Sequence, residues 1–367
     1  MSIINYMLLF VPLAMIAEYF LHAPPTVIFL LSALALISLA AVLGEATEEL
    51  SIHTGPKIGG LIQATLGNAA ELIIAVVALK DQHLELVRAS LTGSIVGNIL
   101  LVLGLSLFFG GLRNGAQYFD RNLTGMAASM LLLAVTGLII PSLFEVLEQV
   151  SHPGTPVQVF HPTGEDPHLK VISLGVAAVL MTIYVLSMIH LFTSSSAEPH
   201  PGTHSAGDVT EHTAKWDIKT ALGVLATATI GIVFMSEFLV DTVDPVGRSL
   251  GVRPLFLGVI AVPIVGNVAE NAVAIVAARK NNLDLTMSIA LGSSMQIALF
   301  VAPLLVFLSL LFGQMLTLFF SLFEVTVLGL SIMLATSIAL DGESNWLEGA
   351  TLLGLWVIAG LGFFFID

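Results

Sequence analysis

Long apolar runs recur along nearly the whole of this chain, and they restrict what it can fold into. A helix of about 20 apolar residues crosses the hydrocarbon core of a bilayer. The chain is 56% apolar and only 10% charged, and its mean hydropathy of +0.97 is far above that of soluble domains. The alternating segments typical of a membrane β-barrel do not occur in it. We therefore expect an all-α integral membrane protein that contacts lipid.

The hydropathy pattern predicts eleven transmembrane helices. The opening segment lacks the basic start and the cleavage site of a signal peptide, so we interpret it as the first span. A polar segment at 193–217, rich in Ser, Thr, His, Gly and Pro, separates two halves of the chain. The expected spans are 3–21, 26–46, 58–79, 86–109, 122–143, 169–192, 218–240, 254–278, 284–312, 315–340 and 346–366.

The charged residues bear on orientation and on partners. Cytoplasmic loops tend to hold more Lys and Arg, and the loops on the N-terminal side carry seven basic residues against five opposite, which favours a cytoplasmic N-terminus. The net charge of −14 does not suggest nucleic-acid binding. The chain has no cysteine, which excludes disulfides.

A repeated motif indicates how the chain is organised. GNAAE at 67–71 recurs as GNVAE at 266–270, and the Gly-Ser pairs at 93–94 and 292–293 keep the same offset of 199 residues. Without the first span, each half has five spans, and an odd number inverts the second half in the membrane. We expect a peripheral first helix and two inverted five-helix repeats, with the boundaries 1–22, 23–192, 193–217 for the polar loop, and 218–367.

The repeated acids, Glu71 and Glu270, carry the functional argument. Inversion should bring them together near the bilayer midplane. A charged carboxylate there is costly unless it is neutral, paired with a cation or facing water. The spans that hold these acids contain no Lys or Arg. A bound divalent cation would balance both acids, and when it leaves, burial favours their protonated form. Metal ions and protons would therefore compete for one site.

Polar neighbours could complete the coordination of such a cation. Ca²⁺ takes about six to eight oxygen ligands, which amides, hydroxyls, carbonyls and water can supply. Pro263 should also loosen its helix and free a carbonyl, whereas the first half has Ala64 at that place. The candidate ligands beside the two acids are Asn68, Asn267, Ser94, Asn98, Ser293 and Gln296.

Two further acids are candidates for a proton pathway. Glu48 and Glu237 each follow a hydroxyl residue near the end of the first span of their half. Glu45 and Glu49 crowd Glu48, and any of the three acids could lie among the lipid headgroups.

Purely structural interpretations of several of these residues remain open. The small residues around the motifs fit helix packing better than ion binding. Ser94 and Ser293 could bond to carbonyls of their own helices, and Asn98 and Gln296 could be bridges between helices. The histidines of the polar loop fit a solvated segment better than a metal site.

Several motifs, in this order, resemble the calcium/cation:proton antiporter family, a branch of the cation/Ca²⁺ exchanger superfamily. The resemblance extends from about residue 26 to the end of the chain. It implies eleven spans, with a peripheral first span and two repeats around a cation site. It assigns the site and proton-pathway residues as above. The motifs are GGLIQATLGNAAELIIAVVAL, GSIVGNILLVLGLSLFFGG, GNVAENAVAIVAA, GSSMQIALFVAP and DGESNWLEGATLLG.

The chain also departs from the pattern of related proteins in informative ways. Related sodium/calcium exchangers carry a Pro directly before the equivalent acid in at least one repeat, whereas this chain has Ala70 and Ala269, which favours proton coupling. Many family members place a strongly acidic helix between the halves, and this chain does not, so we expect no calcium sensing there. It also lacks the long N-terminal extension of plant members, which suggests a lean microbial exchanger.

The sequence therefore predicts a secondary active transporter that exchanges Ca²⁺ for H⁺ by alternating access, and it leaves open whether other divalent cations are also exchanged. We expect it in a microbial plasma (inner) membrane, with no cofactor. A cation-selective channel and a sodium-coupled calcium exchanger are the alternatives. An intramembrane enzyme is disfavoured, because no catalytic motif such as HExxH or GxGD occurs. The sequence leaves the oligomeric state open, a homo-oligomer included.

Overall fold

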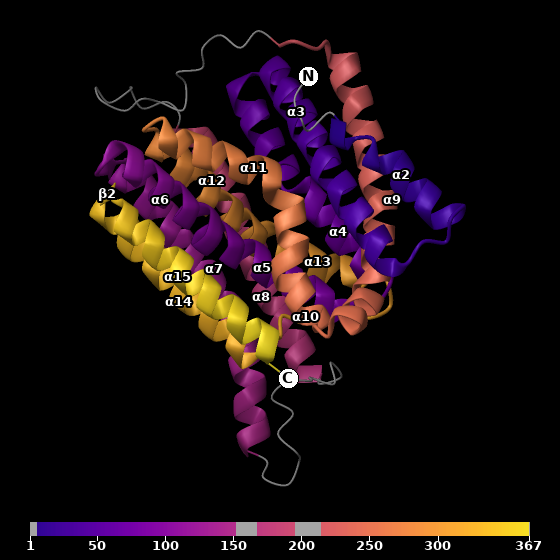
Figure 1. Ribbon diagram of the computed structural model, residues 1–367. Coiled ribbons are helices and arrows are strands. Elements are labelled where there is room, and N and C mark those ends of the chain that lie inside the picture. Colours follow the sequence, from indigo (N-terminus) through magenta and orange to yellow (C-terminus); the bar gives the residue numbers. More distant parts are fainter. Residues whose placement is uncertain (1–5, 152–166, 195–213, 367) are drawn as a thin grey trace.

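The computed structural model describes residues 6–151, 167–194 and 214–366, and these residues form a helical bundle (Figure 1). Most of the expected polar loop at 193–217, with its histidines, lies outside the described residues. The helices of the first half are α2 Phe10–Tyr19, α3 Pro25–Leu66, α4 Ala69–Lys80, α5 Leu84–Val96, η1 Gly97–Val102, α6 Leu103–Asn114, α7 Arg121–Ser151 and α8 Pro167–Ser194. Those of the second half are α9 Ile218–Leu250, α10 Pro254–Phe256, η2 Leu257–Ala261, α11 Val262–Arg279, α12 Leu283–Gln296, η3 Ile297–Val301, α13 Ala302–Ser309, α14 Leu322–Asp341 and α15 Trp346–Phe365.

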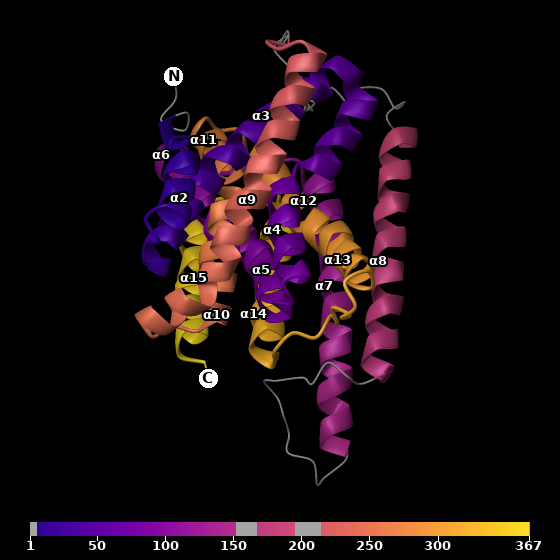
Figure 2. The same ribbon diagram turned by 90° about the vertical axis from the view of Figure 1, so that its right-hand side faces the viewer.

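The expected fold class, an all-α membrane protein, is confirmed. Within the described residues, nine helices are long and apolar enough to cross a membrane, and a bent pair makes ten if it counts as one span. The first expected span contains the shorter helix α2, which lies against α3 and α9 at the edge of the bundle (Figure 2). The count of eleven spans stays a prediction. A two-residue antiparallel pair, β1 Gln117–Tyr118 with β2 Glu343–Ser344, joins two loops.

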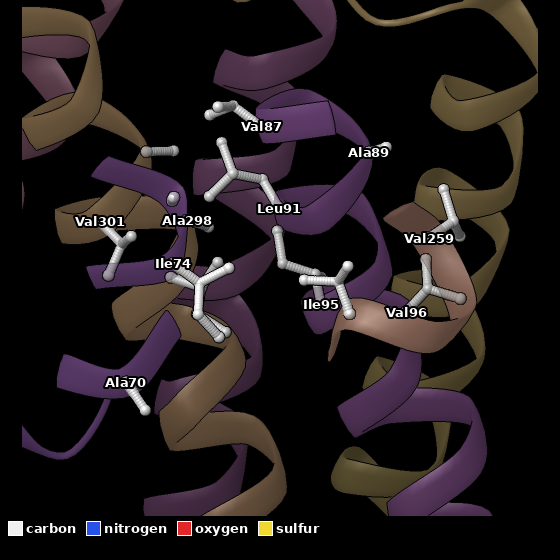
Figure 3. Packing of buried hydrophobic residues seen from close by; sticks show 14 of the residues in the cluster. Ala70, Ile74, Val87, Ala89, Leu91, Ile95, Val96, Val259, Ala298 and Val301 are labelled. Atoms are coloured by element: carbon white, nitrogen blue, oxygen red, sulfur yellow. The ribbon is translucent and has the colours of Figure 1, made fainter. Parts of the chain in front are cut away.

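Helices of the two halves pack on each other throughout the bundle. α3 packs against α9 and α11, α6 against α15, α7 against α14, and α8 against α13. The spans 84–114 and 283–309, which carry the Gly-Ser motifs, are the most enclosed. Figure 3 shows Leu91 and Ile95 of α5 beside Ile74 of α4, with Ala298 of η3 also nearby. This interleaving brings the motifs of both halves to the centre of the protein.

The two halves differ where the repeated motif begins. In the first half the helix breaks between Leu66 and Ala69, and the segments 58–66 and 69–80 are bent by 40°. In the second half 254–279 runs as one span, with a π-helical turn, η2, just before Pro263. A π-helical turn accommodates the missing backbone donor of proline without a break. The sharp bend is thus in the half that has Ala64, rather than at Pro263.

The prediction of a helix from residue 315 is wrong, because α14 begins only at Leu322. The segment 315–320 has no regular secondary structure, and residues 316–320 are buried. Its backbone N–H groups at 316, 318 and 320 donate to serine hydroxyls, from Ser309 at 2.8 Å, Ser173 at 3.0 Å and Ser142 at 2.8 Å. Hydropathy cannot distinguish such a segment from a helix, since non-helical backbone is tolerated at membrane depth where protein satisfies it.

Candidate cation site

Glu71 lies in the first turn of α4, directly after the break in the first half. Its side chain is buried, with 7% exposed. The N-terminus of a helix carries a partial positive charge from its unpaired N–H groups, which stabilises a nearby carboxylate. The break at Gly67 and Asn68 therefore places the N-terminus of α4, with its partial positive charge, beside the carboxylate of Glu71.

Glu270 approaches Glu71 from α11 of the other half. Glu270 follows Gly266 by four residues, about one turn of α11, and Gly266 packs against the side chain of Glu71. A methyl group added at Gly266 would lie only 3.1 Å from Cγ of Glu71, so the glycine of the second motif makes room for the acid of the first. Glu270 itself is half-buried. Two ionised carboxylates on packed helices repel each other unless a proton or a cation lies between them.

Four polar side chains form a continuous line of hydrogen bonds beside the acids. Asn98 Nδ2 donates to Ser293 Oγ at 3.0 Å. Ser293 Oγ donates to Asn68 Oδ1 at 2.9 Å, and Asn68 Nδ2 donates to Gln296 Oε1 at 2.6 Å. Each half contributes two members, so the line crosses the interface between the halves.

Asn267 has a side-chain oxygen that is available to a ligand. Its Nδ2 donates to the Pro263 carbonyl at 3.2 Å, whereas its Oδ1 is buried and has no hydrogen-bond partner. Buried polar atoms rarely stay unpaired. A cavity of about 10 Å³, lined by Ser94, Asn98 and Asn267 among others, has room for one water-sized sphere. An oxygen-seeking cation or a water would satisfy the unpaired atom.

π-helical turns accompany this site in both halves. η1 begins at Gly97, and η3 begins at Ile297, directly after Gln296. Such turns are rare and occur mostly at functional sites, because they interrupt the regular hydrogen-bond ladder. Their matched positions agree with the offset between the motifs.

Comparisons with known proteins identify the family of this chain. The profile of the family described as "Sodium/calcium exchanger protein" matches residues 24–193 and 220–365, segments close to the two expected repeats. Most of the chain is thus covered. The chain belongs to this family. The resemblance to its calcium/cation:proton antiporter branch is confirmed by relatives over nearly full length.

Three relatives illustrate this membership. The "Ca(2+)/H(+) antiporter" of Aphanothece halophytica is 40% identical over 98% of this chain and 95% of its own. The "Ca(2+)/H(+) antiporter ChaA" of Bacillus subtilis (strain 168) is 40% identical over 97% of each chain. The solved structure of native YfkE superposes with a TM-score of 0.81 and 38% identity, covering 99% of this chain and 100% of that one.

The contacts of the polar residues in this exchanger-family site bear on whether they serve only helix structure and packing. Ser293 bonds to side chains of other helices, whereas its neighbour Ser294 bonds to the Ala290 carbonyl of its own helix at 2.8 Å. Asn98 and Gln296 do bridge helices, and their partners are other candidate ligands. Gly93 is a packing position: a methyl group added there would overlap the Val259 carbonyl.

The candidate proton-pathway acids lie apart from this line of hydrogen bonds. Glu48 is exposed on α3. Its neighbour Glu49 is buried and accepts the backbone N–H groups of Lys215 at 2.7 Å and Trp216 at 3.1 Å. Glu237 on α9 forms an ion pair with Lys80 at 3.1 Å. The sequence therefore identified two acids near the ends of their spans. It could not show which acid of the Glu45, Glu48 and Glu49 group is buried.

One buried polar cluster of this family member is not evident from the sequence motifs. Glu324 on α14 is buried and accepts the Thr92 hydroxyl at 3.1 Å, beside Arg88. Arg88 lines a cavity of about 780 Å³ at the end of the bundle where α5 begins, together with Lys170 and Asp244. The signal was present, since Ser321 and Glu324 have the spacing of a capping box.

Proposed function

We propose that this chain exchanges Ca²⁺ for H⁺ across a membrane by alternating access, without covalent chemistry. The observation that carries the proposal is the packing of the two motifs from different halves of the chain, where Glu71 lies against Gly266, one helical turn before Glu270. The names of the full-length relatives, which are Ca²⁺/H⁺ antiporters, support the same activity. Ca²⁺ is the transported substrate in this proposal, and the protein needs no resident cofactor.

The side chains at the site fit a hard divalent cation. The two carboxylates balance its charge, and the oxygens of Asn68, Asn98 and Ser293 are of the type that Ca²⁺ prefers. Asn267 adds an oxygen that has no partner, and Ser94 and Gln296 complete the candidate ligand set. Each of these oxygens has two lone pairs, so it can face the ion while the amide of Asn68 keeps its hydrogen bond to Gln296.

Protons compete with the cation at the same two acids. Once the cation leaves, the two acids favour protonation, because the burial of Glu71 and the mutual repulsion of the carboxylates disfavour the charged forms. A site that must hold either a metal ion or protons couples their movements in opposite directions. Glu48 at one end of the bundle and Glu237 at the other are the acids that we propose for proton access.

The two halves supply the conformational change that exchange requires. We propose that 23–192 and 218–367 are inverted repeats around the site, with 1–22 peripheral and 193–217 a connecting loop. The bend at Gly67–Asn68 has no counterpart of the same form in α11. Related halves that adopt different conformations at equivalent places are a property of transporters that rock around a fixed site.

The structure supports this mechanism better than either alternative. A channel needs a continuous polar route, whereas the polar line here is enclosed and cross-linked by hydrogen bonds. Ala70 and Ala269 stand where a sodium-coupled exchanger would carry a Pro, which supports proton coupling. We place the protein in a microbial plasma membrane with its N-terminus in the cytoplasm, because of its bacterial relatives and its loop charges.

Transport into vesicles tests the proposal. Vesicles containing the purified protein, given an imposed pH gradient and a clamped membrane potential, should accumulate Ca²⁺ above its electrochemical equilibrium. Dissipating the pH gradient with a protonophore should release the excess, and an imposed Na⁺ gradient should not replace it. Ca²⁺ uptake that stops at equilibrium whatever the pH gradient would indicate a channel, and accumulation driven by Na⁺ would indicate a sodium-coupled exchanger.

A further inference from the structure

The Ala64 carbonyl, next to the break in the first half, has an unusual partner. A straight α-helix would pair this carbonyl with the N–H of Asn68, but Asn68 has non-helical backbone angles, φ −100° and ψ 25°. The hydroxyl of Tyr184, on α8, donates to the Ala64 carbonyl at 3.2 Å. Tyr184 is buried, with 4% exposed. A side chain from a distant helix thus satisfies the carbonyl at the broken end.

The second half treats the equivalent carbonyl differently. Pro263, four residues before Asn267, has its carbonyl bonded by the amide of Asn267 itself, at 3.2 Å. In the first half the amide of Asn68 is instead directed to Gln296, at 2.6 Å. The two motif asparagines therefore use the same Nδ2 group in different ways. In the first half the corresponding carbonyl, that of Ala64, accepts the hydroxyl of Tyr184 and not the amide of Asn68.

The ring of Tyr184 contacts the other irregular turn of the site. It stacks on Phe300, with ring centroids 4.9 Å apart and planes 24° from parallel. Phe300 belongs to η3, the π-helical turn that follows Gln296. α8 packs directly on η3. Tyr184 therefore fixes the broken helix of one half and the π-helical turn of the other with a single side chain.

We propose that Tyr184 is a positioning residue for the cation site: it holds the Ala64 carbonyl and so leaves the amide of Asn68 in the polar line with Gln296 and Ser293. This inference rests on the proposed function, since it assigns Tyr184 a role in Ca²⁺ binding at that site. The corresponding fifth helix of the second half, α15, places Trp356 at the small cavity lined by Pro263 and Asn267. There the Pro263 carbonyl accepts a hydrogen bond from the amide of Asn267 rather than from the indole N–H of Trp356.

Replacing Tyr184 by Phe tests the proposal, because it keeps the ring and its stacking and removes only the hydroxyl. The Ala64 carbonyl would then recruit the Asn68 amide, which is the arrangement of the second half, and Asn68 would leave Gln296. Losing one hydrogen bond in the line should raise the half-saturating Ca²⁺ concentration for pH-driven uptake about three- to tenfold, with the maximal rate nearly unchanged. Tyr118→Phe, at an exposed tyrosine, should leave both parameters unchanged.

A double variant shows whether Tyr184 acts through the polar line. In a Gln296→Met background the Asn68 amide has already lost its acceptor, so adding Tyr184→Phe should change the half-saturating concentration by less than twofold. The midpoint of thermal unfolding without Ca²⁺, measured for every variant, detects a general loss of stability. An unchanged half-saturating concentration in Tyr184→Phe, a fall in maximal rate alone, or full additivity with Gln296→Met would each overturn the proposal. Failure of the wild-type protein to accumulate Ca²⁺ would instead refute the proposed function.

Discussion

Glu71→Gln is expected to reduce pH-driven Ca²⁺ accumulation at least 100-fold, to the level of vesicles without protein. Glutamine keeps the shape of the side chain but removes both the negative charge and the exchangeable proton. A buried divalent cation would then face one carboxylate, and the energetic cost of uncompensated charge at membrane depth is high. Glu270→Gln should have the same effect, although Glu270 is the less buried of the two.

The double variant distinguishes one shared site from two separate sites. If the acids are two parts of one site, each single substitution already removes transport, and Glu71→Gln combined with Glu270→Gln is no worse. Glu45→Gln, at an exposed acid on α3, is the matched control and should transport within about twofold of the wild type. A single variant that retains more than a tenth of the accumulation would contradict a shared site.

Gly93→Ala is expected to destabilise the protein and abolish transport, whereas Gly292→Ala, at the repeat-related glycine, is expected to be harmless. A methyl group at Gly93 would overlap the Val259 carbonyl and lie 2.6 Å from Cγ of Pro263, whereas nothing lies within 4 Å of one at Gly292. Overpacking of this kind costs about 1–3 kcal/mol or more. Alanine at an open helical position is favourable by up to about 1 kcal/mol.

Thermal unfolding in detergent, together with vesicle uptake, measures this difference. The midpoint should fall by several degrees for Gly93→Ala and stay level or rise for Gly292→Ala. Because the two glycines have the same place in the repeated motif, no argument from sequence alone separates them. Equal effects of the two substitutions would show that the contact between α5 and η2 is looser than the structure has it.

The sequence predicted the parts of this structure that depend on periodicity and on burial cost. Long apolar runs gave the spans, and the repeated acids gave the centre of the candidate site, because a carboxylate in a membrane helix needs a reason to be there. The offset of the Gly-Ser pairs also pointed to the spans 84–114 and 283–309, whose residues Asn98 and Ser293 are in contact. Composition and spacing are sufficient for such inferences.

The sequence could not predict features that depend on tertiary partners. The proline suggested a kink at Pro263, but the sharp bend lies at Gly67–Asn68. There the hydroxyl of Tyr184, from a distant helix, bonds to the Ala64 carbonyl. Residues 315–320 are as apolar as a span, yet serines from other helices bond to their backbone. Glu48 and Glu49 differ in burial because Glu49 accepts N–H groups of residues 166 and 167 positions later. None of these partners is adjacent in sequence.

Proton release on Ca²⁺ binding tests most directly the central claim that one pair of acids holds either Ca²⁺ or protons. Purified protein in weakly buffered detergent solution is titrated with Ca²⁺, and the released protons are followed with a pH-sensitive dye. The account predicts proton release that saturates together with Ca²⁺ binding, increases as the starting pH is lowered, and disappears in Glu71→Gln and Glu270→Gln. Saturable Ca²⁺ binding with no release of protons at any starting pH would contradict it.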